Sequence, residues 1–100
     1  MLNIIKTQEG EALTVRVEGR LDTFTSPTFL QEVEPLLDNI SKLTLDFEKV
    51  DYISSAGLRV LLTFEQTLEE QNKVMEISKI NEIIHEVFEV TGFLDLLTII

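Results

Sequence analysis

Residues 51–71 contain a short β-prone run that ends at two serines and passes directly into a strongly apolar helical pattern. Leu58, Leu61 and Leu68 recur at helical spacing, which predicts a helix over residues 57–71 with one broad apolar face. A strand that leads straight into a helix of this length calls for a crossover to a parallel neighbour. The stretch therefore favours an α/β sheet with parallel strands.

Further strands are indicated by alternation or by β-branched composition, and they cover residues 2–7, 12–19, 42–48 and 74–77. In the second of these, Leu13, Val15 and Val17 alternate with polar residues, which indicates one buried side and one solvent-facing side. A short turn that contains Gly10 separates the first two segments, so they predict a β-hairpin.

Helical patterns fill the longer intervals between the strands. The run Thr25-Ser26-Pro27 offers a cap residue followed by proline in a first turn, and Pro35 predicts that this helix kinks or ends early. A later helix is predicted over residues 81–90 with Asn81 as its cap, and residues 98–100 are a candidate last strand.

The order of these elements predicts the fold class. We expect a single α/β domain over residues 1–100, with a mixed four- to five-stranded sheet, an N-terminal β-hairpin and helices packed against the sheet. The chain has no cysteine, which excludes a disulfide framework and a thiolate metal site.

The formal net charge is −10, from 18 acidic and 8 basic residues. Repulsion from phosphates argues against direct binding of nucleic acid or of an anionic membrane, whereas a basic protein surface would be attracted. No apolar run approaches the roughly 20 residues that cross a bilayer, and the first residues are too weakly basic for a signal peptide. We therefore expect a soluble, cytoplasmic protein without membrane insertion.

Ser54 and Ser55 lie where the predicted strand gives way to the helix. Unpaired backbone N–H groups and the helix dipole favour negative charge there, so a phosphate on either hydroxyl would be accommodated. From residue chemistry alone, helix capping is the simpler role for both serines. Asp22 and Thr23, in the loop after the second strand, have the composition of turn residues.

Three motifs follow one another along the chain: Glu-Gly-Arg-Leu-Asp-Thr-Phe-Thr at 18–25, Asp-Tyr-Ile-Ser-Ser-Ala-Gly-Leu at 51–58, and Val-Phe-Glu-Val-Thr-Gly-Phe at 87–93. In these motifs, and in their order and spacing, the chain resembles the STAS domain family, and within it the stand-alone bacterial anti-sigma factor antagonists. The resemblance covers nearly the whole chain. It implies the same fold class that the order of elements predicts.

The resemblance also implies a partner switch. In such proteins a kinase-type anti-sigma factor phosphorylates a loop serine, and the phosphorylated antagonist loses its hold on that kinase. The kinase then sequesters a sigma factor, until a phosphatase reverses the modification. Ser55 aligns with the phosphorylated serine, and Ser54 stands where the best-known members carry aspartate. The partner-binding or switch loop implied by the resemblance comprises Asp22, Thr23, Ser54, Ala56, Gly57 and Arg59.

Two other classes of function compete with this one. STAS-like chains also serve as accessory subunits that dock an ATPase of a membrane transport system. An enzyme would need a nucleophile–base pair or a metal cluster, and the single histidine, His85, lies in no such motif. We therefore expect a monomeric binding protein with no cofactor, no metal and no catalytic residues.

Overall fold

Four strands form one mixed sheet in the computed structural model, which describes residues 2–100. In sheet order they are β1 (Leu2–Glu9), β2 (Ala12–Leu21), β3 (Lys42–Ile53) and β4 (Val74–Ser78). The hairpin of β1 and β2 is antiparallel, and β3 and β4 continue the sheet with parallel pairing. A parallel bridge joins Ile99 to Ile77, so the candidate last strand is reduced to this contact. The predicted mixed α/β sheet is confirmed.

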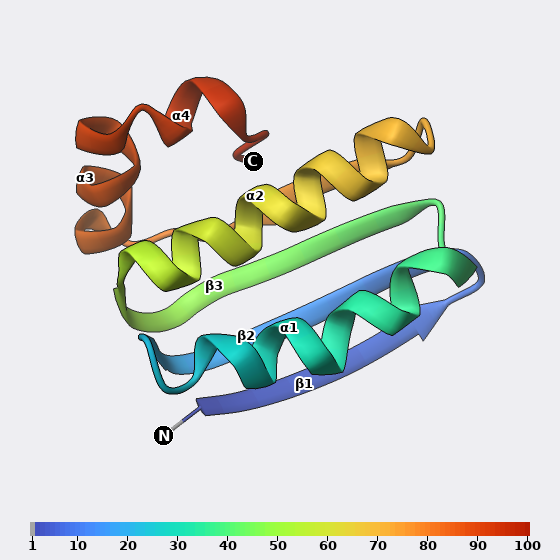
Figure 1. Ribbon diagram of the computed structural model, residues 1–100, viewed down its shortest axis with the longest axis horizontal. Helices are drawn as coiled ribbons and strands as arrows, with labels where there is room; N and C mark the ends of the chain where they lie inside the picture. The colour runs from blue at the N-terminus through green and yellow to red at the C-terminus, as the bar shows by residue number, and fades with distance from the viewer. Residues whose placement is uncertain (1) are drawn as a thin grey trace.

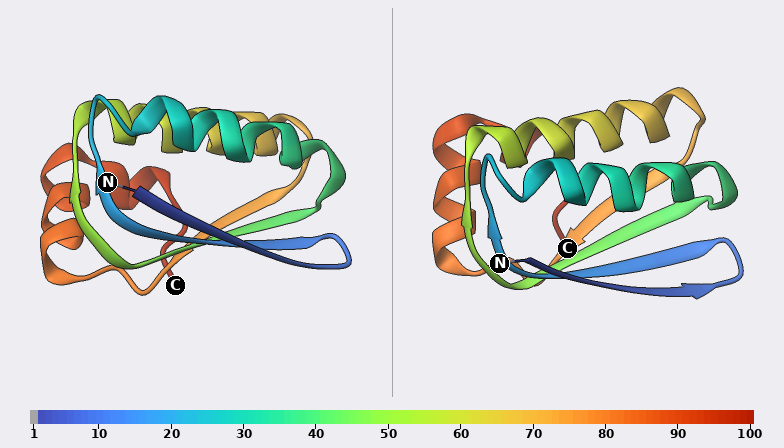
Figure 2. Two further views of the ribbon diagram at one scale, coloured as in Figure 1. Left: turned by 90° about the horizontal axis from the view of Figure 1, so that it is seen from below. Right: turned by 60° about the horizontal axis from the view of Figure 1, so that its bottom comes forward.

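Two helices, α1 (Ser26–Val33) and α2 (Ser55–Glu70), lie side by side (Figure 1) on one face of the sheet, as the left view of Figure 2 shows. A 3₁₀ helix, η1 (Glu34–Asn39), follows α1 and leads into β3. At the end of the sheet where α2 begins lies α3 (Glu82–Thr91), followed by α4 (Phe93–Leu96) (Figure 1).

The core fills the space between the sheet and these helices. The inward sides of β2 and β3 are fully buried as the alternation predicted, with Leu13, Val15 and Val17 on the first strand. From the helices, Phe29 and Phe64 meet edge to face, with ring centroids 5.4 Å apart. Burial of this apolar surface is the main favourable contribution to folding, and it fixes α1 and α2 on the sheet.

The long strands run further than their alternation predicted. β2 ends at Leu21, two residues beyond the expected end at 19, and β3 ends at Ile53, five residues beyond the expected end at 48. A shift in the pairing register between Gly19 and Arg20 interrupts the ladder. Because such an irregularity breaks the period of two, the sequence pattern does not reveal the last residues of either strand.

The predicted helix signals act as expected at Pro35 and Asn81. Helix α1 ends at Val33 and the chain tightens into η1, whose first turn contains Pro35. Asn81 caps α3, since its side-chain oxygen accepts a hydrogen bond of 3.0 Å from the backbone N–H of Ile84.

Candidate functional site

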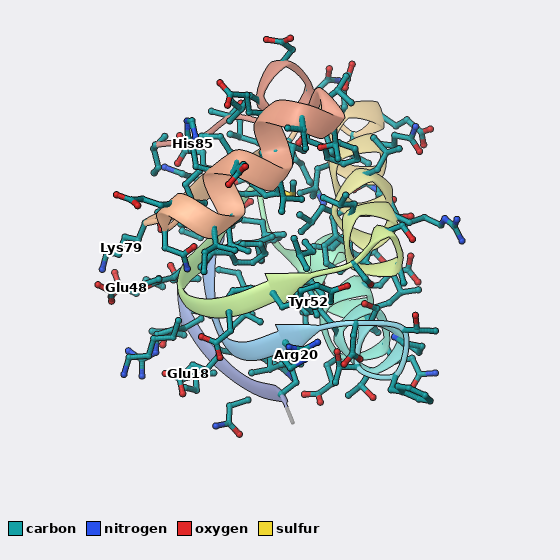
Figure 3. All side chains as sticks on the ribbon, turned by 90° about the vertical axis from the view of Figure 1, so that its left-hand side faces the viewer. Glu18, Arg20, Glu48, Tyr52, Lys79 and His85 are labelled. Atoms are coloured by element: carbon teal, nitrogen blue, oxygen red, sulfur yellow. The ribbon has the colours of Figure 1, made fainter. Side chains whose placement is uncertain are left out.

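The site is built at the carboxyl ends of the neighbouring parallel strands β2 and β3. A four-residue loop, residues 22–25, connects β2 to α1, whereas β3 reaches α2 through Ser54 alone. The backbone N–H of Ser54 donates to the carbonyl of Leu21 at 2.8 Å, which ties the two connections together. Figure 3 looks onto this end of the sheet. Ligands of open α/β sheets bind outside the carboxyl ends of the strands, so this is the expected place for a binding site.

Ser55 is the first residue of α2, and its side chain is exposed. The helix therefore begins two residues earlier than the predicted start at residue 57. The hydroxyl lies at the end of the helix where the dipole favours negative charge.

Ser54 occupies the cap position of α2, with extended backbone angles of φ −96° and ψ 177°. Its side chain makes no capping hydrogen bond, and its hydroxyl oxygen is buried without a partner among residues 2–100. Only its backbone carbonyl serves the helix, by accepting from the N–H of Leu58 at 3.0 Å. The expectation of a side-chain cap at Ser54 is therefore wrong, although the position is right.

Gly57 is buried where α2 crosses the ends of the two strands. A methyl group at this position would lie 2.8 Å from the Cγ1 of Ile53 and 3.0 Å from the backbone oxygen of Leu21. The absence of a side chain thus allows close packing of the helix on the sheet. This packing accounts for the glycine without any approach of a partner backbone.

The loop from 22 to 25 is held by the carboxylate of Asp22. Its Oδ1 accepts from the backbone N–H groups of Phe24 and Thr25 at 2.9 and 3.0 Å. These bonds, above all the one from Thr25, hold the pKa of the Asp22 carboxyl below its usual value, and the Arg20 guanidinium acts in the same direction. Asp22 is therefore a turn-forming residue, and its Oδ1 is fully used by the loop.

Thr25 lies in the predicted cap position of α1, yet its hydroxyl bonds backwards instead of capping the helix. It donates to the carbonyl of Arg20 at 2.6 Å and accepts from the N–H of Asp22 at 2.9 Å. Arg20 also lies over the ring of Tyr52 on β3, with its guanidinium carbon 4.3 Å from the ring centroid, and Figure 3 labels this pair. The loop is thus attached to the end of β2, and Arg20 joins that end to β3.

The side chain of Phe24 is 89% exposed at the tip of this loop. Phe24 is not among the candidate site residues that the sequence motifs indicated, although a large apolar residue among turn residues is a usable signal. Exposed aromatic side chains are enriched at protein interfaces, where they supply much of the binding energy.

Two hollows flank the start of α2. The first, which we call the α1–α2 groove, has a volume of about 350 Å³ and is lined by Thr23, Ser26, Pro27, Leu30, Ala56, Arg59, Val60 and Thr63. The second, the Ser55 hollow, has a volume of about 250 Å³ and is lined by Ser55, Leu58, Arg59, Leu62, Thr91 and Phe93. Arg59 borders both. The fold thus brings Thr23, Ala56 and Arg59 into one groove and places Ser55 in the neighbouring hollow.

His85 is exposed on α3 and is labelled in Figure 3. Across residues 2–100, no group of three or more histidine or carboxylate side chains is arranged to hold a metal ion. Within the same part of the chain, every helix is too short or too polar to cross a membrane.

The sequence pattern of the STAS domain family matches residues 3–100. The anti-sigma-B factor antagonist of Staphylococcus aureus is 30% identical over 97 residues, which are 96% of this chain and 90% of the relative. The fold is similar to that of an anti-sigma factor antagonist from Mycobacterium paratuberculosis, with a TM-score of 0.88 and 18% identity over 99% of this chain and 85% of that one.

A second similar structure is that of the Bacillus cell fate determinant SpoIIAA in its phosphorylated form. It has a TM-score of 0.77 and 15% identity, and it covers 98% of this chain and 91% of that one. The architecture defined here, a mixed sheet with helices on one face, is thus that of SpoIIAA-like α/β folds. This chain belongs to the STAS domain family, as its three motifs predicted.

Proposed function

We propose that this chain is an anti-sigma factor antagonist whose binding is controlled by phosphorylation of Ser55. The observation that carries the proposal is the exposed serine at the first position of α2, directly before Ala56, which lines the α1–α2 groove. The name of the Staphylococcus relative supports the role, and the phosphorylated form of SpoIIAA supports a phosphate in this fold. The partner is a serine-kinase anti-sigma factor. When the unphosphorylated chain binds this kinase, a sigma factor is freed; phosphorylation ends the binding, and a phosphatase restores the chain.

The effect of the phosphate follows from its charge. Phosphorylation adds about −1.5 to −2 charges and three acceptor oxygens at neutral pH. The chain already carries a net charge of −10, so the partner surface that meets it is expected to be complementary at its rim. A phosphate at the edge of the contact must nevertheless be desolvated there, and its volume overfills a closely packed contact. A loss of about 1.4 kcal/mol is already a tenfold loss of affinity.

The partner contact in this proposal is the α1–α2 groove together with Phe24. The groove is lined mainly by small and apolar side chains from both helices. The exposed Phe24 follows Thr23, which lines the groove, in the loop before α1. An aromatic anchor beside an apolar groove is typical of binding hot spots. Ala56 and Arg59 of the groove lie at the start of α2 together with Ser55, so a phosphate on Ser55 can affect this part of the contact.

The direct test uses the purified chain with its cognate anti-sigma kinase and ATP. Mass spectrometry is expected to locate one phosphate on Ser55, and Ser55→Ala is expected to abolish the modification. Ser54→Ala is the matched control, since it removes the neighbouring hydroxyl and is expected to leave phosphorylation intact. For binding, Ser55→Asp should weaken the complex at least tenfold, because it places a permanent charge at the same point.

Phosphate on Ser54 alone, or equal affinity of the wild-type and Ser55→Asp chains for the kinase, would contradict the proposal. Calorimetry or surface plasmon resonance gives the affinities. Ser55→Ala should bind the kinase as the wild-type chain does, because it changes only an exposed hydroxyl.

A further inference from the structure

Arg59 differs from the other cations of the chain in what surrounds it. Of the 8 lysines and arginines, six form ion pairs with carboxylates, and Lys73 donates to the backbone oxygen of Leu37 at 2.7 Å. Among residues 2–100, Arg59 alone has neither a carboxylate within 4.0 Å nor a hydrogen-bond acceptor for its guanidinium. In a chain with a net charge of −10, a cation left without a partner is unexpected.

Ser55 is the residue whose side chain Arg59 can pair with. The two side chains lie four residues apart on α2, are both exposed, and line the same hollow of about 250 Å³. Residues at this spacing are neighbours on a helix surface, and the pair is stronger when the acidic member is nearer the N-terminus. The other neighbours of Arg59 at this spacing, Ala56, Leu62 and Thr63, carry no charge, so no carboxylate on α2 competes.

We propose that phosphorylation of Ser55 forms an ion pair between the new phosphate and the guanidinium of Arg59. Arginine binds phosphate oxygens through two parallel N–H donors, and such charge-assisted hydrogen bonds are stronger than neutral ones. The pair would fix the Arg59 side chain over the Ser55 hollow, away from the α1–α2 groove that it also borders.

This pair gives the modification two effects on a partner. The phosphate adds negative charge at the edge of the contact, and the pairing removes the unpartnered cation from the groove. A partner carboxylate that meets Arg59 in the unmodified chain therefore loses its counterion on phosphorylation. Arg59 is thus part of the switch and not only a residue of the binding surface.

The inference rests on the proposed function for its modification site, but its test needs no kinase. Phosphoserine is placed at position 55 during translation by amber suppression, and its phosphorus resonance is followed by NMR as the pH is varied. The pairing is expected to make the second acid dissociation constant of the phosphate about two- to fivefold larger in the wild-type chain than in Arg59→Gln. The difference should vanish near 1 M salt, where the screening length is about 3 Å.

Arg16→Gln is the matched control, because it makes the same chemical change on the outer side of β2, where Arg16 pairs with Glu18. It should leave the dissociation constant as in the wild type, and Arg59→Lys should retain part of the effect. Equal constants in wild-type and Arg59→Gln chains, or an equal change in Arg16→Gln, would overturn the inference. Those results would leave the kinase assay untouched, whereas an unmodified Ser55 in that assay would reject the proposed function and leave the pairing measurable.

Discussion

At the scale of single residues, Gly57 decides how closely α2 lies on the sheet. A methyl group on Gly57 would lie only 2.8 Å from the Cγ1 of Ile53 and 3.0 Å from the Cβ of Leu21, so these residues leave no room for it. Gly57→Ala is therefore expected to destabilise the fold by about 1–3 kcal/mol, the usual cost of overpacking, despite the better helix propensity of alanine. Urea unfolding measures the loss, with Ser55→Ala on the same turn as the control. An unchanged unfolding midpoint for Gly57→Ala would show that the helix shifts freely.

The same position shows how far a candidate site can be predicted from sequence. The motif places a glycine two residues after Ser55, but whether it faces a partner or the sheet depends on the crossing of α2 with two strands. That crossing is a tertiary contact, so no local pattern contains it. For the same reason the sequence did not reveal that Ser54 lacks its capping bond. The turn-forming role of Asp22 rests on local bonds, and its residue type did predict it.

At the scale of elements, α2 carries a partly buried charged residue, Glu65. One carboxylate oxygen of Glu65 is buried without a hydrogen-bond partner among the described residues. Burial, together with the charge of Glu69 one turn later, raises the pKa of the Glu65 carboxyl above its usual value. The folded chain thus binds this proton more tightly than the unfolded chain does. The favourable contribution of the group is complete below its unfolded pKa and is lost as the pH rises through its folded pKa.

Glu65→Gln is therefore expected to stabilise the chain at neutral pH and to have little effect near pH 4. The gain in the free energy of unfolding should increase as the pH rises, because only the wild-type side chain becomes charged at this partly buried position. Thermal unfolding followed by circular dichroism across this range measures it. Glu69→Gln, at an exposed position, is the control and should give a smaller gain. A gain for Glu65→Gln that is equal at both ends of the pH range would contradict the assignment.

At the scale of the whole molecule, alternation and helical spacing predicted the hairpin, the parallel crossovers and the buried sides of β2 and β3. These features could be predicted because burial imposes a period of 2.0 on strands and about 3.6 on helices. The register shift in the β2–β3 ladder and the extra length of both strands follow no such period. The α1–α2 groove likewise arises only when segments far apart in sequence, around Thr23 and Ala56, are brought together.

The exposed side chain of Phe24 provides the sharpest test of the partner surface. Phe24→Ala is expected to leave the stability unchanged, since the ring is 89% exposed, but to weaken binding of the anti-sigma kinase by about 2 kcal/mol or roughly 30-fold. Val90→Ala is the matched control, because Val90 is 75% exposed on α3 and does not line the α1–α2 groove. Calorimetric titration of both variants separates a specific anchor from a general need for apolar surface. Equal losses in the two variants, or none in Phe24→Ala, would place the contact elsewhere on the molecule.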